Sequence, residues 1–110
     1  MRTPRTYSPT TQEAVELLGA QIRLARKERR WSQQNLADRA GVNRMTLYKI
    51  EHGDPTVGIG TAFEVAALVG VPLFHAERSR LSLDLDRTRA RGAVLPQRVR
   101  TRTADVHDDF

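Results

Sequence analysis

Arginine is the most abundant residue type in this sequence that can bind an anionic partner. The chain has 110 residues, with 18 lysine and arginine residues against 13 aspartate and glutamate residues, and a formal net charge of +5. All but two of these cations are arginine, whose planar guanidinium forms paired hydrogen bonds with phosphate and with guanine. Between Ala20 and Lys49 eight cations stand against two acids. We therefore expect a polyanionic partner, and by charge alone DNA, RNA or an anionic membrane surface would each fit.

Residues typical of catalytic and metal sites are sparse. The chain has no cysteine, which excludes disulfides and thiolate chemistry. His52, His75 and His107 lie far apart, and no pair has the spacing of metal ligands. Gly58-Ile59-Gly60 begins like a dinucleotide-binding fingerprint, but Phe63 replaces its last glycine and no strand precedes it. We therefore expect no enzymatic activity, no metal and no cofactor.

The stretch from Trp31 to Gly53 has the pattern of two short helices joined by a tight turn. Ser32 and Asn43 are the residue types that cap the N-termini of helices, here over 33–40 and 44–52. Gly41 suits the left-handed residue that ends the first helix. The positions expected to face inward are Leu36, Ala37, Ala40, Val42, Leu47 and Ile50. This pattern is typical of a helix-turn-helix unit.

The arrangement resembles the helix-turn-helix of the phage-repressor-like (XRE) family. In that family an alanine, a glycine and two aliphatic residues recur where this chain has Ala37, Gly41, Leu47 and Ile50. The resemblance implies a DNA-binding domain of five helices. It also implies a structural ion pair between an arginine of the first helix and a glutamate at the end of the recognition helix, here Arg26 and Glu51.

A helix of this kind fits the major groove of DNA, where side chains on its first turns meet base edges. The residues expected to contact bases are Arg44, Met45, Thr46 and Lys49. The residues expected to contact phosphates are Ser32, Gln33, Asn43 and Tyr48. One such domain covers little DNA, so we expect a homodimer on a palindromic operator whose half-sites lie about 34–36 Å apart.

The segments before and after this stretch complete an all-α fold. Residues 1–9 are expected to form a flexible basic arm, followed by a helix that starts within two residues of Thr10 and runs to about Arg30. Trp31 is expected to pack under the first two helices as an apolar anchor. A fourth helix is expected over 59–69, and its predicted inward residues are Phe63, Ala66 and Ala67.

The domain boundaries follow from composition. A fifth element is expected to start at Val71-Pro72 and to complete a repressor-like helix-turn-helix domain over residues 10–78. Residues 79–110 form an arginine-rich extension, with an additional helix over about 81–91. After Pro96 we expect an irregular tail that is first basic and then acidic.

The two ends of the chain resemble HipB-type antitoxins, the DNA-binding partners of HipA-type serine/threonine kinases. The similar features are the Tyr7-Ser8-Pro9 start and the LPQRVR…DDF tail. The resemblance implies a protein that dimerises, represses its own operon and holds the kinase inactive. The tail residues expected to dock on the kinase are Val106, Asp108, Asp109 and Phe110. The apolar ones would enter a pocket, and the carboxylates would meet basic residues at its rim.

Other interpretations of the sequence remain open at this stage. The chain fits a stand-alone XRE regulator without a toxin partner, or a basic module that binds RNA or protein and uses the helix pair as a scaffold. An ordinary helical hairpin with a solvated basic face is the simplest alternative. No apolar stretch approaches the roughly 20 residues of a membrane helix, and the N-terminus lacks the apolar core of a secretory signal, so a cytoplasmic location is expected.

Overall fold

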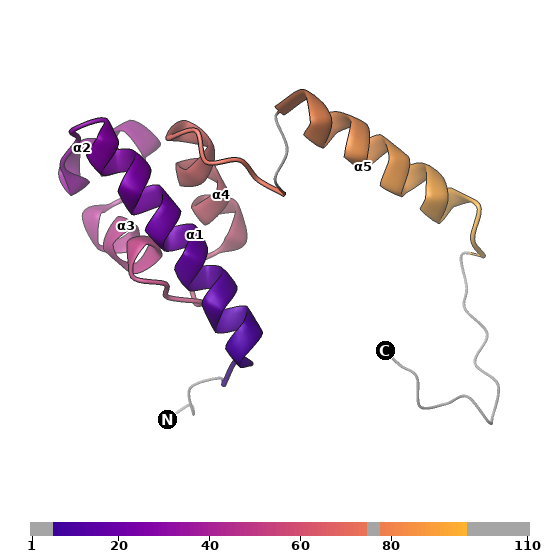
Figure 1. Ribbon diagram of the computed structural model, residues 1–110, viewed down its shortest axis with the longest axis horizontal. Coiled ribbons are helices and arrows are strands. Elements are labelled where there is room, and N and C mark those ends of the chain that lie inside the picture. The colour runs from indigo at the N-terminus through magenta and orange to yellow at the C-terminus, as the bar shows by residue number, and fades with distance from the viewer. Residues whose placement is uncertain (1–5, 75–77, 97–110) are drawn as a thin grey trace. The chain divides into compact units, whose positions relative to one another are not determined.

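Five helices and no strand are present in the part of the chain that the computed structural model describes, residues 6–74 and 78–96. The helices are α1 (Pro9–Glu28), α2 (Gln33–Ala40), α3 (Arg44–Glu51), α4 (Ile59–Leu68) and α5 (Arg78–Ala93). The predicted all-α class is confirmed. The chain divides into two compact units, residues 1–75 and 76–110. In the first unit α3 and α4 each pack against both α1 and α2 (Figure 1).

Ser8 and Pro9 determine where α1 begins. The Ser8 Oγ accepts the Thr11 N–H at 3.3 Å, and Pro9 occupies the first helical position, where its missing N–H leaves no bond unmade. The start within two residues of Thr10 is confirmed. The helix ends at Glu28, slightly earlier than the sequence predicted.

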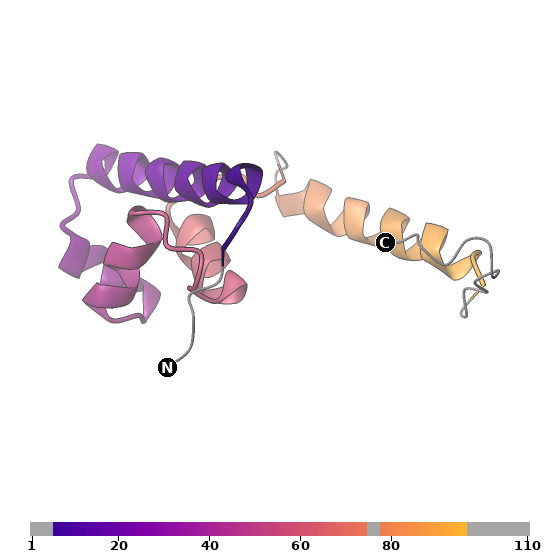
Figure 2. The same ribbon diagram turned by 90° about the horizontal axis from the view of Figure 1, so that it is seen from below.

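The core of the first unit is aliphatic. Its buried side chains come from all four helices and from the turn after α4: Ile22, Leu36, Ala37, Leu47, Ile50, Val65, Ala66, Val69 and Val71. Each fully buried Val, Leu or Ile side chain contributes about 1.5–3 kcal/mol. The predicted inward residues of α2 and α3 therefore hold α3 against α1, α2 against α4, and the two helices against each other. Figure 2 shows α1 running along one side of this unit, with α2, α3 and α4 on the other.

Gly19 is the point at which α1 crosses the end of α3. This glycine is buried, and a Cβ at its position would overlap the carbonyl oxygen of Ile50. A hydrogen side chain therefore lets the two backbones touch. Nearby, the Gln12 Nε2 of α1 donates to the Gly53 carbonyl oxygen at 2.9 Å. Both contacts fix the end of α3 against α1.

The first four helices end in Schellman turns, in which a left-handed residue returns the chain toward the last helical carbonyls. Gly41, Gly53 and Gly70 occupy three of these turns, with φ values of 72°, 73° and 79°. The fourth turn has Arg30, with φ 60°. Its N–H donates to the Lys27 carbonyl at 2.9 Å, and the next N–H donates to the Arg26 carbonyl at 3.2 Å. Because Arg30 carries a Cβ, this conformation costs roughly 1–2 kcal/mol that glycine avoids.

The inward face of α4 differs from the predicted one. Val65 and Ala66 are buried and Phe63 is half-buried, but Ala67 is exposed, so its predicted inward position was wrong. The buried stripe continues to Val69, at helical spacing from Val65. Nearly every residue of α4 is apolar, so composition could not choose the face, and a small alanine loses little when it is exposed.

The element predicted to start at Val71-Pro72 does not begin there. Val71 is buried in the core, and Pro72 is not helical. Phe74 has a left-handed φ of 57°, which lies outside the α-helical region. The turn at Gly70 sends the chain back to the core instead of into another helix. Residues 75–77 lie outside the described residues, and the next helix starts at Arg78.

The described part of the second unit is α5. It covers the helix predicted over 81–91 and extends it at both ends. Its leucines are largely exposed, with Leu83 and Leu85 at 41% and 47%. None of the helices within residues 6–74 and 78–96 is both long and apolar enough to span a membrane. The predicted docking residues Val106, Asp108, Asp109 and Phe110, and most of the predicted basic arm, fall outside the described residues.

Candidate nucleic-acid interface

α3 has one face in the core and one face open. Leu47 and Ile50 are 0% and 4% exposed, whereas Met45 and Tyr48 are 61% and 47% exposed. The buried face packs against α1 and α2. The open face therefore points away from both helices and is accessible to a macromolecule.

Three of the four residues predicted to contact bases lie on this open face. Arg44, Met45 and Lys49 are exposed. Met45 and Lys49, four residues apart, lie one above the other, and with Arg44 at the start of the helix they form the exposed stripe of α3. Thr46 is half-buried at the border between the stripe and the core. The stripe therefore offers a guanidinium, an ammonium and a thioether chain. The two cations suit the acceptor atoms of guanine, and the thioether suits the methyl group of thymine.

Ser32 and Asn43, which were predicted to contact phosphates, are the N-caps of α2 and α3. The Ser32 Oγ accepts the Asn35 N–H at 3.0 Å, and the Asn43 Oδ1 accepts the Thr46 N–H at 2.7 Å. Capping uses only an acceptor atom, so the serine hydroxyl and the asparagine amide each keep a donor for a phosphate. Both helix N-termini also present unpaired backbone N–H groups and the positive end of the helix dipole.

Tyr48 is the fourth predicted phosphate contact, and its ring stacks on His52. The ring centroids are 3.9 Å apart, with an angle of 23° between the planes. The His52 Nδ1 also lies 2.8 Å from the Tyr48 carbonyl oxygen. From the sequence, His52 was considered only as a possible metal ligand, and this stack was not predicted. Its spacing of four residues from an aromatic residue on a helix was the signal that could have revealed the stack.

A buried ion pair locks the end of α3. The Arg26 guanidinium donates to both Glu51 oxygens, at 2.7 Å from Nε and 2.9 Å from Nη2. The two side chains are 9% and 0% exposed. The Arg26 Nη1 also donates to the Trp31 carbonyl oxygen at 2.9 Å. The pair implied by the family resemblance is confirmed, and it joins α3 to α1 and to the turn before α2.

Gln33 supports this ion pair from α2. Its Nε2 donates to the Glu51 Oε1 at 3.3 Å, and the side chain is half-buried. From the sequence, Gln33 was predicted to contact phosphate, and its contact with Glu51 was not predicted. The backbone N–H of Gln33, in the first turn of α2, has no acceptor within its own helix. The second hydrogen of the Gln33 Nε2 and this backbone N–H both remain as donors for a phosphate.

Trp31 packs against the core as predicted, but it is only half-buried. The Arg39 guanidinium lies 4.1 Å from the ring centroid, and the Arg29 guanidinium lies 5.7 Å from it. The Asn35 Oδ1 also accepts from the Arg39 Nε at 2.6 Å. The sequence predicted that the first two helices would cover the Trp31 ring, but Arg29 and Arg39 cover part of it instead. They hold positive charge beside the turn that precedes α2.

The loop after α3 begins with an anionic turn. The Thr56 hydroxyl and N–H both donate to the Asp54 Oδ1, at 2.6 and 2.8 Å. Both bonds stabilise the ionised carboxylate and lower the pKa of Asp54 below its ordinary value of 3.8. The bond from the Thr56 hydroxyl has the larger effect. The C-terminal end of α3 thus carries a fixed negative charge. Phosphate is disfavoured there and favoured at the N-terminal end of the helix.

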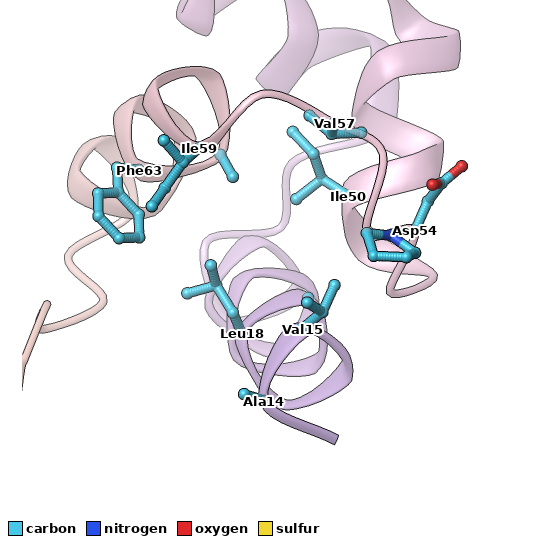
Figure 3. Close-up of a pocket in the computed structure, with 11 residues that line it drawn as sticks. Ala14, Val15, Leu18, Ile50, Asp54, Val57, Ile59 and Phe63 are labelled. Carbon is cyan, nitrogen blue, oxygen red and sulfur yellow. The ribbon is translucent and has the colours of Figure 1, made fainter. Parts of the chain in front are cut away.

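An apolar groove lies between α1, the loop after α3 and α4 (Figure 3). Its volume is about 380 Å³, and Val15, Leu18, Val57 and Phe63 are among the residues that line it. Asp54 is the one ionisable side chain in its lining. Within residues 6–74 and 78–96, no three His, Cys, Asp or Glu side chains are grouped as metal ligands would be. The lining of the groove is therefore apolar apart from Asp54.

The first unit thus combines two short helices, a left-handed glycine between them, an open basic face and an ion pair that locks the second helix. Residues 22–75 match the family model described as helix-turn-helix. Residues 22–75 are a helix-turn-helix domain. The match supports a role for this domain in DNA binding and transcription regulation.

The family match confirms the predicted DNA-binding class and part of the predicted family assignment. It is a match to helix-turn-helix domains in general and carries no information about the HipB type. Neither the curated proteins nor the solved structures provide a match to this chain. The operator, the dimer and a toxin partner must therefore be argued from the chain itself.

Proposed function

We propose that this helix-turn-helix protein is a sequence-specific repressor whose α3 enters the major groove of its operator. The observation that carries the proposal is the open face of α3, with Arg44, Met45 and Lys49 on a helix locked from behind by Arg26 and Glu51. Arg44 and Lys49 would donate to the O6 and N7 of guanine, and Met45 would contact a thymine methyl. The locked helix supports this function because base readout needs donors held in fixed positions.

Phosphate contacts would set the register of the domain on the duplex. Ser32 and Asn43 cap the two helices that frame the open face, so their remaining donors and the adjacent backbone N–H groups suit the flanking phosphates. The backbone N–H of Gln33 and the hydroxyl of Tyr48 complete this set. Thr46, half-buried at the border of the open face, would contact a thymine methyl near the start of α3.

We also propose that two copies bind together on a palindrome. α3 has eight residues, so it is only about 12 Å long and spans a few base pairs. A single small module buries about 600–1,000 Å² of protein surface, below the usual range for tight specific binding by a whole protein. Two domains related by a two-fold axis would double that area and read half-sites about 34–36 Å apart.

The test of base readout is Arg44→Ala, measured on the operator and on random DNA of equal length. The operator is first selected from a randomised duplex library with the natural protein. A lost guanine contact should weaken operator binding about 5- to 150-fold, with a much smaller loss on random DNA. Arg23→Ala is the control, because Arg23 is an exposed cation of α1. Equal losses on both DNAs for Arg44→Ala would rule out base reading by this residue.

As a finer proposal, the repressor is the antitoxin of a toxin–antitoxin operon and neutralises a HipA-like kinase. The supporting feature is the acidic C-terminal sequence ADVHDDF, whose terminal aromatic residue suits an apolar pocket. The similarity to HipB-type antitoxins at Tyr7-Ser8-Pro9 is explained by the start of α1, because Ser8 caps this helix and Pro9 is its first residue. The C-terminal sequence therefore carries the antitoxin proposal alone.

A chain ending at Thr103 tests this role if a HipA-like kinase gene lies beside the gene for this chain. The full chain should bind the kinase, and the shortened chain should bind it much more weakly while keeping its affinity for the operator. Unchanged kinase affinity would rule out docking through the tail. If no kinase gene lies beside the gene, the stand-alone regulator becomes the better description.

A basic module that binds RNA or protein is the remaining alternative. RNA readers usually offer free aromatic faces to bases. Here the Trp31 ring is covered by arginines, and Tyr48 already stacks on a histidine. Binding to RNA as tight as binding to the selected operator would favour this alternative over repression.

A further inference from the structure

α5 is strongly basic and lies outside the helix-turn-helix unit. Its 16 residues include five arginines and two aspartates. Arg80, Arg87, Arg89 and Arg91 are exposed. Charge is also uneven along the chain, because from Arg87 to Ala104 the sequence has six arginines and no acidic residue. The positive charge therefore begins in the second half of α5 and continues beyond it.

The arginines of α5 are not neutralised within the helix. Asp84 and Asp86 stand three or four residues from Arg80, Arg87 and Arg89, which is the usual spacing of helical ion pairs. Nevertheless, among residues 6–74 and 78–96 the structure forms one ion pair, between Arg26 and Glu51 in the first unit. The guanidinium donors of Arg80, Arg87, Arg89 and Arg91 are thus available to an external anion.

The arrangement of these arginines suits a row of anions better than a single one. Arg80, Arg87 and Arg91 are separated by seven and four residues, so they share one face of the helix. They span eleven residues, or about 16 Å along the axis. Duplex DNA presents one phosphate charge per about 1.7 Å of its axis. Arginine is also the side chain whose planar fork matches phosphate geometry.

We propose that α5 is a second DNA-binding element that contacts the phosphate backbone of the duplex that α3 reads. This inference rests on the proposed operator binding and assigns a role to a helix that the family match does not cover. Phosphate contacts carry no sequence information, so α5 would add the same factor of affinity to the operator and to any other duplex. Its attachment to the operator-binding unit raises its local concentration on DNA once α3 has bound.

The experiment compares two double variants of the full chain with equal charge loss. Arg87→Gln with Arg91→Gln removes two cations four residues apart in α5. Arg23→Gln with Lys27→Gln removes two cations with the same spacing from the exposed side of α1. Fluorescence anisotropy gives the affinity for the selected operator and for a scrambled duplex at salt concentrations from about 50 to about 200 mM. In this range the affinity for DNA depends strongly on the salt concentration.

Each phosphate contact contributes about 0.9 to the slope of log affinity against log salt concentration. The α5 variant should therefore lose about 1.8 of slope per protomer, so raising the salt fourfold should weaken the natural protein roughly 12-fold more than this variant. Its losses on operator and scrambled DNA should be equal. The α1 variant should keep the slope. Equal slopes for the two variants would overturn the inference, since net charge alone would then explain the effect.

Two further outcomes separate this inference from the proposed function. If the natural protein does not distinguish operator from scrambled DNA, the proposed sequence-specific repressor fails. If it does, but the α5 variant keeps its salt slope, only the role of α5 fails. Sedimentation of both variants at binding concentrations completes the test. A shift from dimer to monomer in the α5 variant alone would assign its arginines to a protein interface and also contradict phosphate contact.

Discussion

The ion pair between Arg26 and Glu51 should be the most sensitive polar contact in the domain. Glu51→Gln keeps the shape of the side chain and removes its charge. It leaves the Arg26 guanidinium, 9% exposed, without a carboxylate and weakens two bonds of 2.7 and 2.9 Å. Removing one partner of a buried pair costs about 3–5 kcal/mol, because the remaining charge is desolvated and unpaired. For a domain of this size that is a large part of the total stability.

Thermal unfolding followed by circular dichroism measures this loss. At about 4–8 °C for each kcal/mol, the expected loss lowers Tm by more than about 12 °C. Asp38→Asn is the matched control, because Asp38 is an exposed carboxylate that accepts from Gln34 at 2.8 Å, and its loss should stay within about 0.5 kcal/mol.

A second variant separates lost charge pairing from lost packing. Arg26→Met combined with Glu51→Leu replaces the pair by apolar side chains and leaves no buried charge. It should recover most of the stability lost in Glu51→Gln, because the desolvation cost disappears together with the attraction. A loss below about 1 kcal/mol in Glu51→Gln, the usual value for an exposed pair, would refute the reasoning.

Three further predictions follow from the backbone and from the loop after α3. Gly19→Ala should destabilise the domain by about 1–3 kcal/mol, because the added methyl group forces α1 away from α3; urea unfolding measures this loss. The control is Gly60→Ala on α4, where the methyl group meets no other atom and the change should be neutral or stabilising. Arg30→Gly should raise stability by about 0.5–1 kcal/mol, since the strain relieved exceeds the entropy that glycine adds to the unfolded chain; a fall in Tm would contradict it. Thr56→Val should raise the pKa of Asp54 toward 3.8 in an NMR titration, and an unchanged pKa would show that the hydroxyl bond is not its cause. Because the natural fold lowers this pKa, the stability from Asp54 is present above pH about 3.8 and is lost as the pH falls through the lowered value.

The helix-turn-helix unit could be predicted because its determinants are local. Ser32 and Asn43 cap within three residues of themselves, and Gly41 supplies the left-handed turn without help from the rest of the chain. Leu47 and Ile50 are three residues apart, so they lie on the same face of α3 and determine which face is buried. Short-range chemistry of this kind is readable in sequence because each signal acts within a single turn of helix.

The features that sequence reasoning missed depend on contacts between distant segments. Gly19 looks like an ordinary helical glycine until the end of α3 is placed against it. Ala67 differs from Ala66 only in the direction it faces, which α1 and α2 decide. Arg30 adopts a glycine-like conformation because the following residues are held by the core and by Arg26, and no local signal marks it.

The open face of α3 is proposed to read a DNA sequence. The most direct measurement is the ratio of affinities of the natural protein for the selected operator and for a scrambled duplex of equal length, at one physiological salt concentration. A specific reader should show a ratio of about 10³ or more. A ratio near one would mean that the protein binds DNA only as a polyanion, and it would contradict the account.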